Sequence, residues 1–258
     1  MSLIVKGQTT AFLTQILFAV ILLTYISRAR GGRKIPYIRR VSGLDALDEA
    51  IGRATEMGRP VHYSPGISDV NEAQTLASMA ILEYVARMAA KNDVRLIVSN
   101  RMVLVQTLTE GVVRDAYLRE GRADSYNPDN VRFLTDNQFG YATGVTGILR
   151  RERVATAIAI GAFWAESLIF AQTGYEIGAI QIAGTANTHQ IPFFVAACDY
   201  CLIGDEMYAA SAYISKEPVL MGSLVAADYA KMAVIGVLVI GLLFMLGGSD
   251  ALVTLIKN

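Results

Sequence analysis

Two long apolar segments lie near the ends of the chain. Residues 9–27 and residues 232–248 contain no charged side chain. A transmembrane helix needs about 20 mostly apolar residues to cross a hydrocarbon core of about 30 Å. Because both segments are apolar on every side, lipid suits them better than the alternative, the core of a soluble protein. The pattern predicts transmembrane helices over residues 9–27 and 231–248.

Basic residues flank the first apolar segment unequally. Only Lys6 precedes it, whereas six basic residues follow it: Arg28, Arg30, Arg33, Lys34, Arg39 and Arg40. A cleaved signal peptide would be followed by a small-residue cleavage site, and a basic linker over residues 28–42 stands there instead. Basic residues near helix ends stay in the cytoplasm. We therefore expect the short ends, residues 1–8 and 249–258, to lie outside, and the central part to face the cytoplasm at the inner membrane.

Residues 43–220 alternate between short β-branched runs and helical patterns. The expected strands cover residues 60–64, 95–99, 131–135, 155–160, 179–183 and 193–197. The expected helices cover residues 43–57, 72–90, 102–119, 140–151, 163–173 and 205–214. This alternation is typical of right-handed βαβ units. It predicts an α/β domain with a mostly parallel, Rossmann-like sheet and helices on both faces.

A third apolar stretch covers residues 154–172. Glu166 lies past its middle, where a charge costs roughly 2.5–3.5 kcal/mol on membrane insertion. Gly161 divides the stretch into a β-like half and a helix-like half. A buried strand followed by a helix is therefore favoured over a third membrane segment.

Small and hydrogen-bonding residues gather where the expected strands end. In parallel sheets, ligands bind beyond the carboxyl ends of the strands. The candidate ligand-binding residues are Ser64, Gly66, Ser99, Asn100, Asp136, Asn137, Gly184, Thr185 and Asn187. The same residue types also make turns and helix caps, which explains each of them singly. Their coincidence at one edge is the argument for a site.

The remaining motifs do not build a catalytic centre. Gly140, Gly144 and Gly147 differ from the dinucleotide fingerprint in their spacing, and no P-loop lysine follows them. The sequence contains no G-x-S-x-G elbow. Glu166 and Glu206 are candidate general bases, but favourable charge at a helix N-terminus explains both equally well. We expect no cofactor.

Cys198 and Cys201 form a lone C-x-x-C motif. A structural zinc site needs four ligands, and a second cysteine pair is absent from the sequence. His62 and His189 could complete a set only by converging from distant strands. Two buried, inert thiols and no metal are the favoured reading, and so few cysteines suit a reducing compartment.

Charge excludes one class of partner. Lys plus Arg and Asp plus Glu are balanced at 23 each. Nucleic-acid binding normally needs a net basic face, so we expect none here. The predicted partners are the lipid bilayer and further copies of the chain, and a small-molecule ligand is the open alternative.

Three segments resemble a known family: residues 46–66, residues 183–215 and the closing apolar helix. The family consists of uncharacterised membrane proteins of bacteria and archaea, classified as a domain of unknown function. The resemblance implies an α/β domain tethered to the membrane, and it brings no catalytic residue.

Two function hypotheses follow from these features. The first is a membrane-anchored structural or scaffold subunit that forms homo-oligomers through its α/β domain. The alternative is a membrane-tethered sensor that binds a small ligand or nucleotide in the strand-end cleft. An enzyme ranks third, because we find no catalytic set.

Overall fold

The computed structural model describes residues 9–31 and 41–247. The predicted external ends, residues 1–8 and 249–258, lie outside the described residues, as does most of the linker. Contacts divide the chain into two units. One is the α/β domain, Arg39–Ser215, and the other combines the two ends of the chain.

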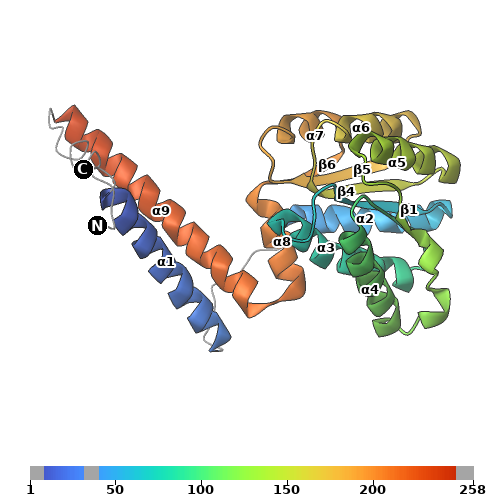
Figure 1. Cartoon of the computed structure of the whole chain (residues 1–258), viewed down its shortest axis with the longest axis horizontal. Coiled ribbons are helices and arrows are strands. Elements are labelled where there is room, and N and C mark those ends of the chain that lie inside the picture. The colour runs from blue at the N-terminus through green and yellow to red at the C-terminus, as the bar shows by residue number, and fades with distance from the viewer. Residues whose placement is uncertain (1–8, 32–40, 248–258) are drawn as a thin grey trace. The chain divides into compact units, whose positions relative to one another are not determined.

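The α/β domain contains one six-stranded sheet, and all of its strands are parallel (Figure 1). The strands are β1 Val61–Gly66, β2 Leu96–Asn100, β3 Val131–Phe133, β4 Thr156–Ala162, β5 Ile180–Thr185 and β6 Tyr200–Ile203. Their order is β3-β2-β1-β4-β5-β6. Every residue of β1 and β2 is buried, as expected for strands covered on both faces. The predicted α/β class is confirmed.

Helices cover both faces of this sheet. One face packs against α2 Ser42–Met57, α3 Ala73–Lys91, α4 Val103–Arg119 and α8 Asp205–Ser215. The other packs against α5 Gln138–Glu152, α6 Ser167–Glu176 and α7 Ile191–Ala197. Two short 3-10 turns, Ala123–Ser125 and Pro128–Asn130, precede β3. Stretch 154–172 forms β4 and most of α6, as the strand-then-helix prediction stated.

One predicted strand is wrong. Residues 193–197 belong to helix α7, and the sixth strand is β6, Tyr200–Ile203. The run Phe-Phe-Val-Ala-Ala suits a strand by composition, but Pro192 occupies the first turn of α7. Proline is preorganised for that position because its φ is fixed and its missing N–H is not needed there. Cys198 N–H then donates to Phe194 O at 2.8 Å, which closes the helix.

The second unit is an antiparallel helix pair. Helix α1, Thr9–Arg30, packs against α9, Pro218–Leu246, which begins well before the predicted apolar segment. Gly222 lets the backbones approach, since a Cβ there would lie 3.0 Å from Tyr25 O. Further along, the Tyr25 and Tyr229 rings stack with centroids 5.0 Å apart. Ala29 of α1, whose Cβ would lie 3.0 Å from a Cβ on Gly222, is the second small residue of this helix contact.

Candidate functional site at the carboxyl edge of the sheet

The strand order creates one position where the connections diverge. β1 and β4 are neighbours, yet the chain leaves β1 for α3 on one face and β4 for α6 on the other. Ligands of parallel sheets bind at such a switch point. All nine predicted site residues lie at or just beyond the carboxyl ends of their strands. This edge is therefore the candidate site.

The backbones of β1 and β4 stay close at the switch point itself. Ile67 N–H donates to Ala162 O at 2.9 Å. Gly66 and Gly161 both have positive φ values, +97° and +148°. A Cβ on Gly161 would lie 2.1 Å from Pro65 O, so only glycine fits there. A Cβ on Gly66 would likewise lie 2.6 Å from Ala162 O, so Gly66 serves close backbone packing.

Ser64 and Ser99 belong to a buried hydrogen-bonded set. Tyr141, from α5, donates its hydroxyl proton to Ser99 O at 2.9 Å, so Ser64 Oγ, 2.7 Å away, donates to Tyr141. His62 Nε2 lies 2.9 Å from Ser99 Oγ. All four side chains are buried. Burial, helped by Arg132, lowers the pKa of His62 to about 3, and burial raises the pKa of Tyr141. At neutral pH the set is uncharged, and it ties β1, β2 and α5 together.

Asn100 ends β2 and is only partly satisfied. Its Nδ2 donates to Gln106 Oε1 at 2.8 Å. Its Oδ1 is buried and has no hydrogen-bond partner among the described residues. A buried acceptor without a donor costs about 1–3 kcal/mol. Asn100 therefore keeps hydrogen-bonding capacity for a water or a ligand.

Asp136 and Asn137 lie in the loop after β3. Asn137 Oδ1 accepts from Gly140 N–H at 2.8 Å and so caps α5. Arg101 donates through Nε to Asp136 O and through Nη1 to Ile67 O, both at 2.8 Å. Arg101 thereby links the loops that follow β1 and β3.

The residues of the β5 end are gathered by Gln74, from the first turn of α3. Gln74 Oε1 accepts from Ala186 N–H at 2.8 Å and from the Thr185 hydroxyl at 3.2 Å. Gln74 Nε2 donates to Asn187 Oδ1 at 2.8 Å. Gly184 packs between Ile160 and Leu202 and offers no side chain. The predicted residues on β5 are thus joined to α3 rather than to those on β1 and β2.

A buried carboxylate lies where β4 leads into α6. Glu166 Oε1 accepts from Trp164 N–H at 2.8 Å, and Oε2 accepts from Gln138 Nε2 at 2.5 Å. The Glu166 side chain is fully buried. Neither donor is a backbone N–H of the first turn of α6, so Glu166 stands at the N-cap position without capping the helix through its side chain.

Three of the organising side chains escaped the sequence analysis: Gln74, Gln138 and Tyr141. Each lies in the first turn or two of a helix that follows a strand end. A long polar side chain at that position was the available signal. Its partner, however, lies on a distant strand or loop.

The loop between β1 and α3 is acidic. Asp69 and Glu72 lie there, and Glu72 is the N-cap residue of α3. Dinucleotide-binding folds place a pyrophosphate at this helix N-terminus. Two carboxylates would repel it, so the strand order alone does not make this a dinucleotide site.

A model of one protein family, described as Domain of unknown function (DUF6754), matches residues 1–256. The chain belongs to this family. The expected resemblance to a domain of unknown function is confirmed to that extent. Comparisons with curated proteins and with solved structures found no match. The function of this DUF6754 chain has therefore to be argued from its geometry.

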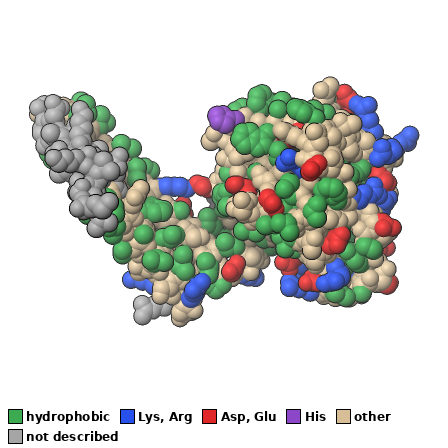
Figure 2. Space-filling model, in the orientation of Figure 1, with side chains coloured by type: hydrophobic (Ala, Val, Ile, Leu, Met, Phe, Trp, Pro, Cys, Tyr) green, Lys and Arg blue, Asp and Glu red, His purple; other side chains and the backbone are tan. Residues whose placement is uncertain are grey.

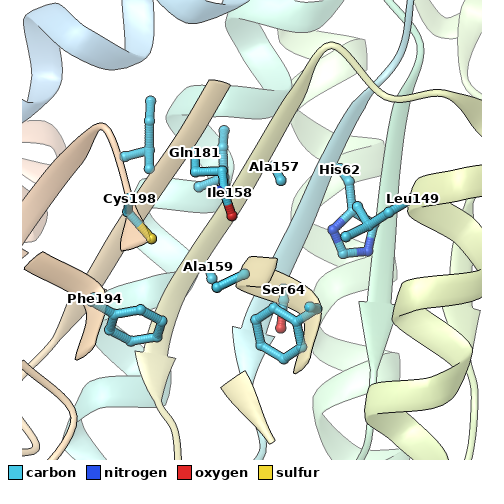
Figure 3. A pocket seen from close by; sticks show the side chains of 12 residues that line it. His62, Ser64, Leu149, Ala157, Ile158, Ala159, Gln181, Phe194 and Cys198 are labelled. Carbon is cyan, nitrogen blue, oxygen red and sulfur yellow. The ribbon is translucent and has the colours of Figure 1, made fainter. Parts of the chain in front are cut away.

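A small cavity lies between the sheet and α5–α7 of the DUF6754 chain. Its volume is about 10 Å³, enough for one water molecule. Figure 3 shows His62 and Ser64 on one side of it, Phe194 and Cys198 on the other, and Ala157 between. The short side chain of Ala157 leaves this space unfilled. The cavity is too small for a metabolite.

A larger depression of about 290 Å³ lies beside α2, away from the carboxyl edge. Glu49 and Arg53 line it from α2, and their ion pair spans 2.5 Å. Asp199 and Tyr200 line it from the start of β6. None of the nine predicted site residues lies in it.

The two cysteines of the DUF6754 chain are half-buried neighbours. Cys198 ends α7, and Cys201 lies in β6. Their mutual hydrogen bond, then burial, raises the pKa of Cys198, and the same bond lowers the pKa of Cys201. Within residues 9–31 and 41–247, no group of three His, Cys, Asp or Glu side chains could hold a metal ion.

Proposed function

We propose that this DUF6754 chain is a membrane-anchored subunit that self-associates through its α/β domain. The observation that carries the anchoring is the apolar exterior of the α1–α9 pair. Large side chains such as Leu17, Leu23, Leu238 and Leu243 are exposed on it. Two helices of 22 and 29 residues are about 33 and 43 Å long, against about 30 Å of hydrocarbon. A lipid environment would cover this surface.

The aromatic contact of the pair supports one orientation. Tyr25 stacks on Tyr229, and the Arg28 guanidinium lies 5.8 Å from the centre of the Tyr25 ring. Tyrosine rings are enriched at the membrane–water interface, and arginine near a helix end favours the cytoplasmic side. These residues lie at the end of α1 that leads into the basic linker. The α/β domain would then face the cytoplasm.

The carboxyl edge favours assembly over catalysis. Its polar side chains mostly hydrogen-bond one another and sit on tightly packed glycine backbone. A catalytic site needs a reacting group within hydrogen-bond reach of a substrate. Here Ser64, Ser99 and Glu166 are buried and already paired.

The sensor is the second candidate, and the orphan acceptor Asn100 Oδ1 is the observation that favours it. A neutral ligand with a hydrogen-bond donor suits this site better than a nucleotide, because Asp69 and Glu72 precede α3. A ligand that binds only the folded state raises the melting temperature. A panel of metabolites that produced no shift in the detergent-solubilised chain would remove this candidate.

The main test uses the full-length chain. Alkaline carbonate washing of membranes should leave it in the pellet, and protease added outside intact spheroplasts should spare the α/β domain. In mild detergent, native mass spectrometry should find two or more copies per particle. Release into the supernatant would refute the anchoring, and a uniform monomer would refute the self-association.

A further inference from the structure

Helices α6 and α7 present apolar side chains on both of their sides. Phe163, Phe170 and Phe194 point inward, with ring centroids 5.6–5.7 Å apart. The outward side chains define the α6–α7 face, and 38–53% of each is exposed: Trp164, Leu168, Ile169, Phe193 and Val195. A helix that is apolar all round is normally buried. The α6–α7 face is therefore more apolar than the exterior of a solvated helix, and the exposed polar side chains of α6, Gln172 and Glu176, lie toward its C-terminal end.

This face is also nearly free of charge. The chain has no Lys or Arg between Arg153 and Lys216. Of the two acids on or beside α6, Glu166 is buried and Glu176 pairs with Arg150 at 2.7 Å. Figure 2 shows hydrophobic side chains along the upper part of the domain, where Figure 1 places α6 and α7. Charged side chains gather instead along the right-hand edge.

The absence of charge indicates which kind of partner could cover the α6–α7 face. Surfaces that bind bilayers combine apolar side chains with Lys and Arg, and the α6–α7 face has neither cation. A charged protein partner would need opposite charges here. A second copy needs neither, because in a two-fold contact the same surface meets itself, and an uncharged apolar surface has no like charges to oppose.

The size of the face fits an assisted contact. A large side chain has on the order of 150–250 Å² of surface. The five side chains of the face are about half exposed, so together they present roughly 400–500 Å² of apolar surface. A standard interface covers about 800 Å² per partner. The face thus supplies about half of one, and membrane tethering raises the local concentration enough for weak contacts to form.

We propose that the α6–α7 face is the surface through which two copies of this chain associate. The proposal rests on the self-association proposed above and names its interface. Charged residues are depleted at the centre of protein interfaces, as they are here.

The test compares matched variants of the full-length chain in mild detergent, each with one added basic side chain. Ile169→Arg places a cation in the α6–α7 face, and Val195→Lys does so from α7. Val103→Arg, at a position that is 63% exposed on α4 and the opposite side of the sheet, is the control. All three substitutions replace exposed side chains, so melting temperatures should stay near the wild-type value. The two face variants should raise the dissociation constant at least tenfold, and Val103→Arg should leave it unchanged.

The outcomes separate the two proposals. A monomeric wild type would overturn self-association and its interface together. A wild-type dimer that survives both face substitutions would overturn only the interface, since lipid or another protein would then cover α6 and α7. Dissociation by Val103→Arg as well would also overturn it, because the effect would not be specific to the face. If Ile169→Arg misfolds, Val195→Lys decides alone.

Discussion

The close approach of the β1 and β4 backbones at Gly161 gives the sharpest stability prediction. Gly161, the penultimate residue of β4, lies next to the irregular Ser64–Gly66 end of β1, and its φ is +148°. In Gly161→Ala the new Cβ would lie 2.1 Å from Pro65 O, closer than any real contact. The strands must separate, which also disturbs the bond from Ile67 N–H to Ala162 O.

The magnitude follows from these two effects. A non-glycine residue in a strained backbone region costs about 1–3 kcal/mol. A lost backbone hydrogen bond adds about 1 kcal/mol. We expect Gly161→Ala to lower the free energy of unfolding by about 3 kcal/mol, which is a fall in melting temperature of about 6–12 °C for a chain of this size.

A second glycine provides a control with the opposite sign. Gly111 lies within α4, and a Cβ there would meet no atom within 4 Å. Replacing a mid-helix glycine by alanine stabilises by about 0.5–1 kcal/mol. Circular dichroism melts of the detergent-solubilised chain should therefore shift in opposite directions for Gly161→Ala and Gly111→Ala. A Gly161→Ala melt within about 2 °C of the wild type would show that the β1–β4 approach is not as tight as described.

Three further predictions concern a buried tyrosine, a buried histidine and the half-buried cysteine pair. Tyr141→Phe should lower the free energy of unfolding in urea by about 1–2 kcal/mol, because the Ser64 hydroxyl and Ser99 O both lose a hydrogen-bond partner. An unchanged unfolding midpoint would contradict these hydrogen bonds. The pKa of His62 is lowered to about 3, so below pH 6.5 the unfolded chain binds a proton that the native chain excludes. The contribution of His62 to the free energy of unfolding is fully present above pH 6.5 and falls by up to about 1.4 kcal/mol per pH unit toward pH 3. His62→Gln should reduce that slope in acid melts. Cys201, whose pKa is lowered, should react with iodoacetamide faster than Cys198 at pH 7.5, as measured by peptide mapping. Cys198→Ser should slow the reaction of Cys201, and equal rates for the two wild-type thiols would argue against their hydrogen bond.

The sequence was sufficient for those elements whose pattern is local. β2, β4 and β5 are short runs with β-branched residues between helices, and such runs form parallel strands buried on both faces. The apolar run at residues 193–197 was ambiguous, because a short apolar segment suits a strand or a buried helix equally. Pro192, which suits the first turn of a helix, is the sequence signal that favours α7, and the strand prediction did not use it.

The position of the candidate site was predictable from the sequence, but the hydrogen-bond partners of its residues were not. Topology puts Ser64, Ser99 and Thr185 at one edge of the sheet, as expected from the strand ends alone. Their partners are far away in sequence: Tyr141 lies 77 residues from Ser64, and Gln74 lies 111 residues from Thr185. Periodicity reports which face a residue occupies and says nothing about which side chain it meets there. Whether any of these residues binds a ligand stays a prediction.

Charged residues are distributed unevenly along the domain, and this distribution distinguishes the α6–α7 face from the rest of its surface. Basic residues of the domain before residue 154 pair with acids on α3, α4 and α5, as in Arg87–Glu120, Arg119–Glu83 and Arg95–Glu152. Exposed pairs of this kind contribute little to stability, but they keep a surface hydrated, since burying them carries a desolvation penalty. Between Arg153 and Lys216 the chain has no Lys or Arg, and apolar side chains face outward from α6 and α7. A function that depends on contact between subunits would use this half of the domain, whereas a function that depends on a polar cleft would have to open the hydrogen bonds that now hold the carboxyl edge together.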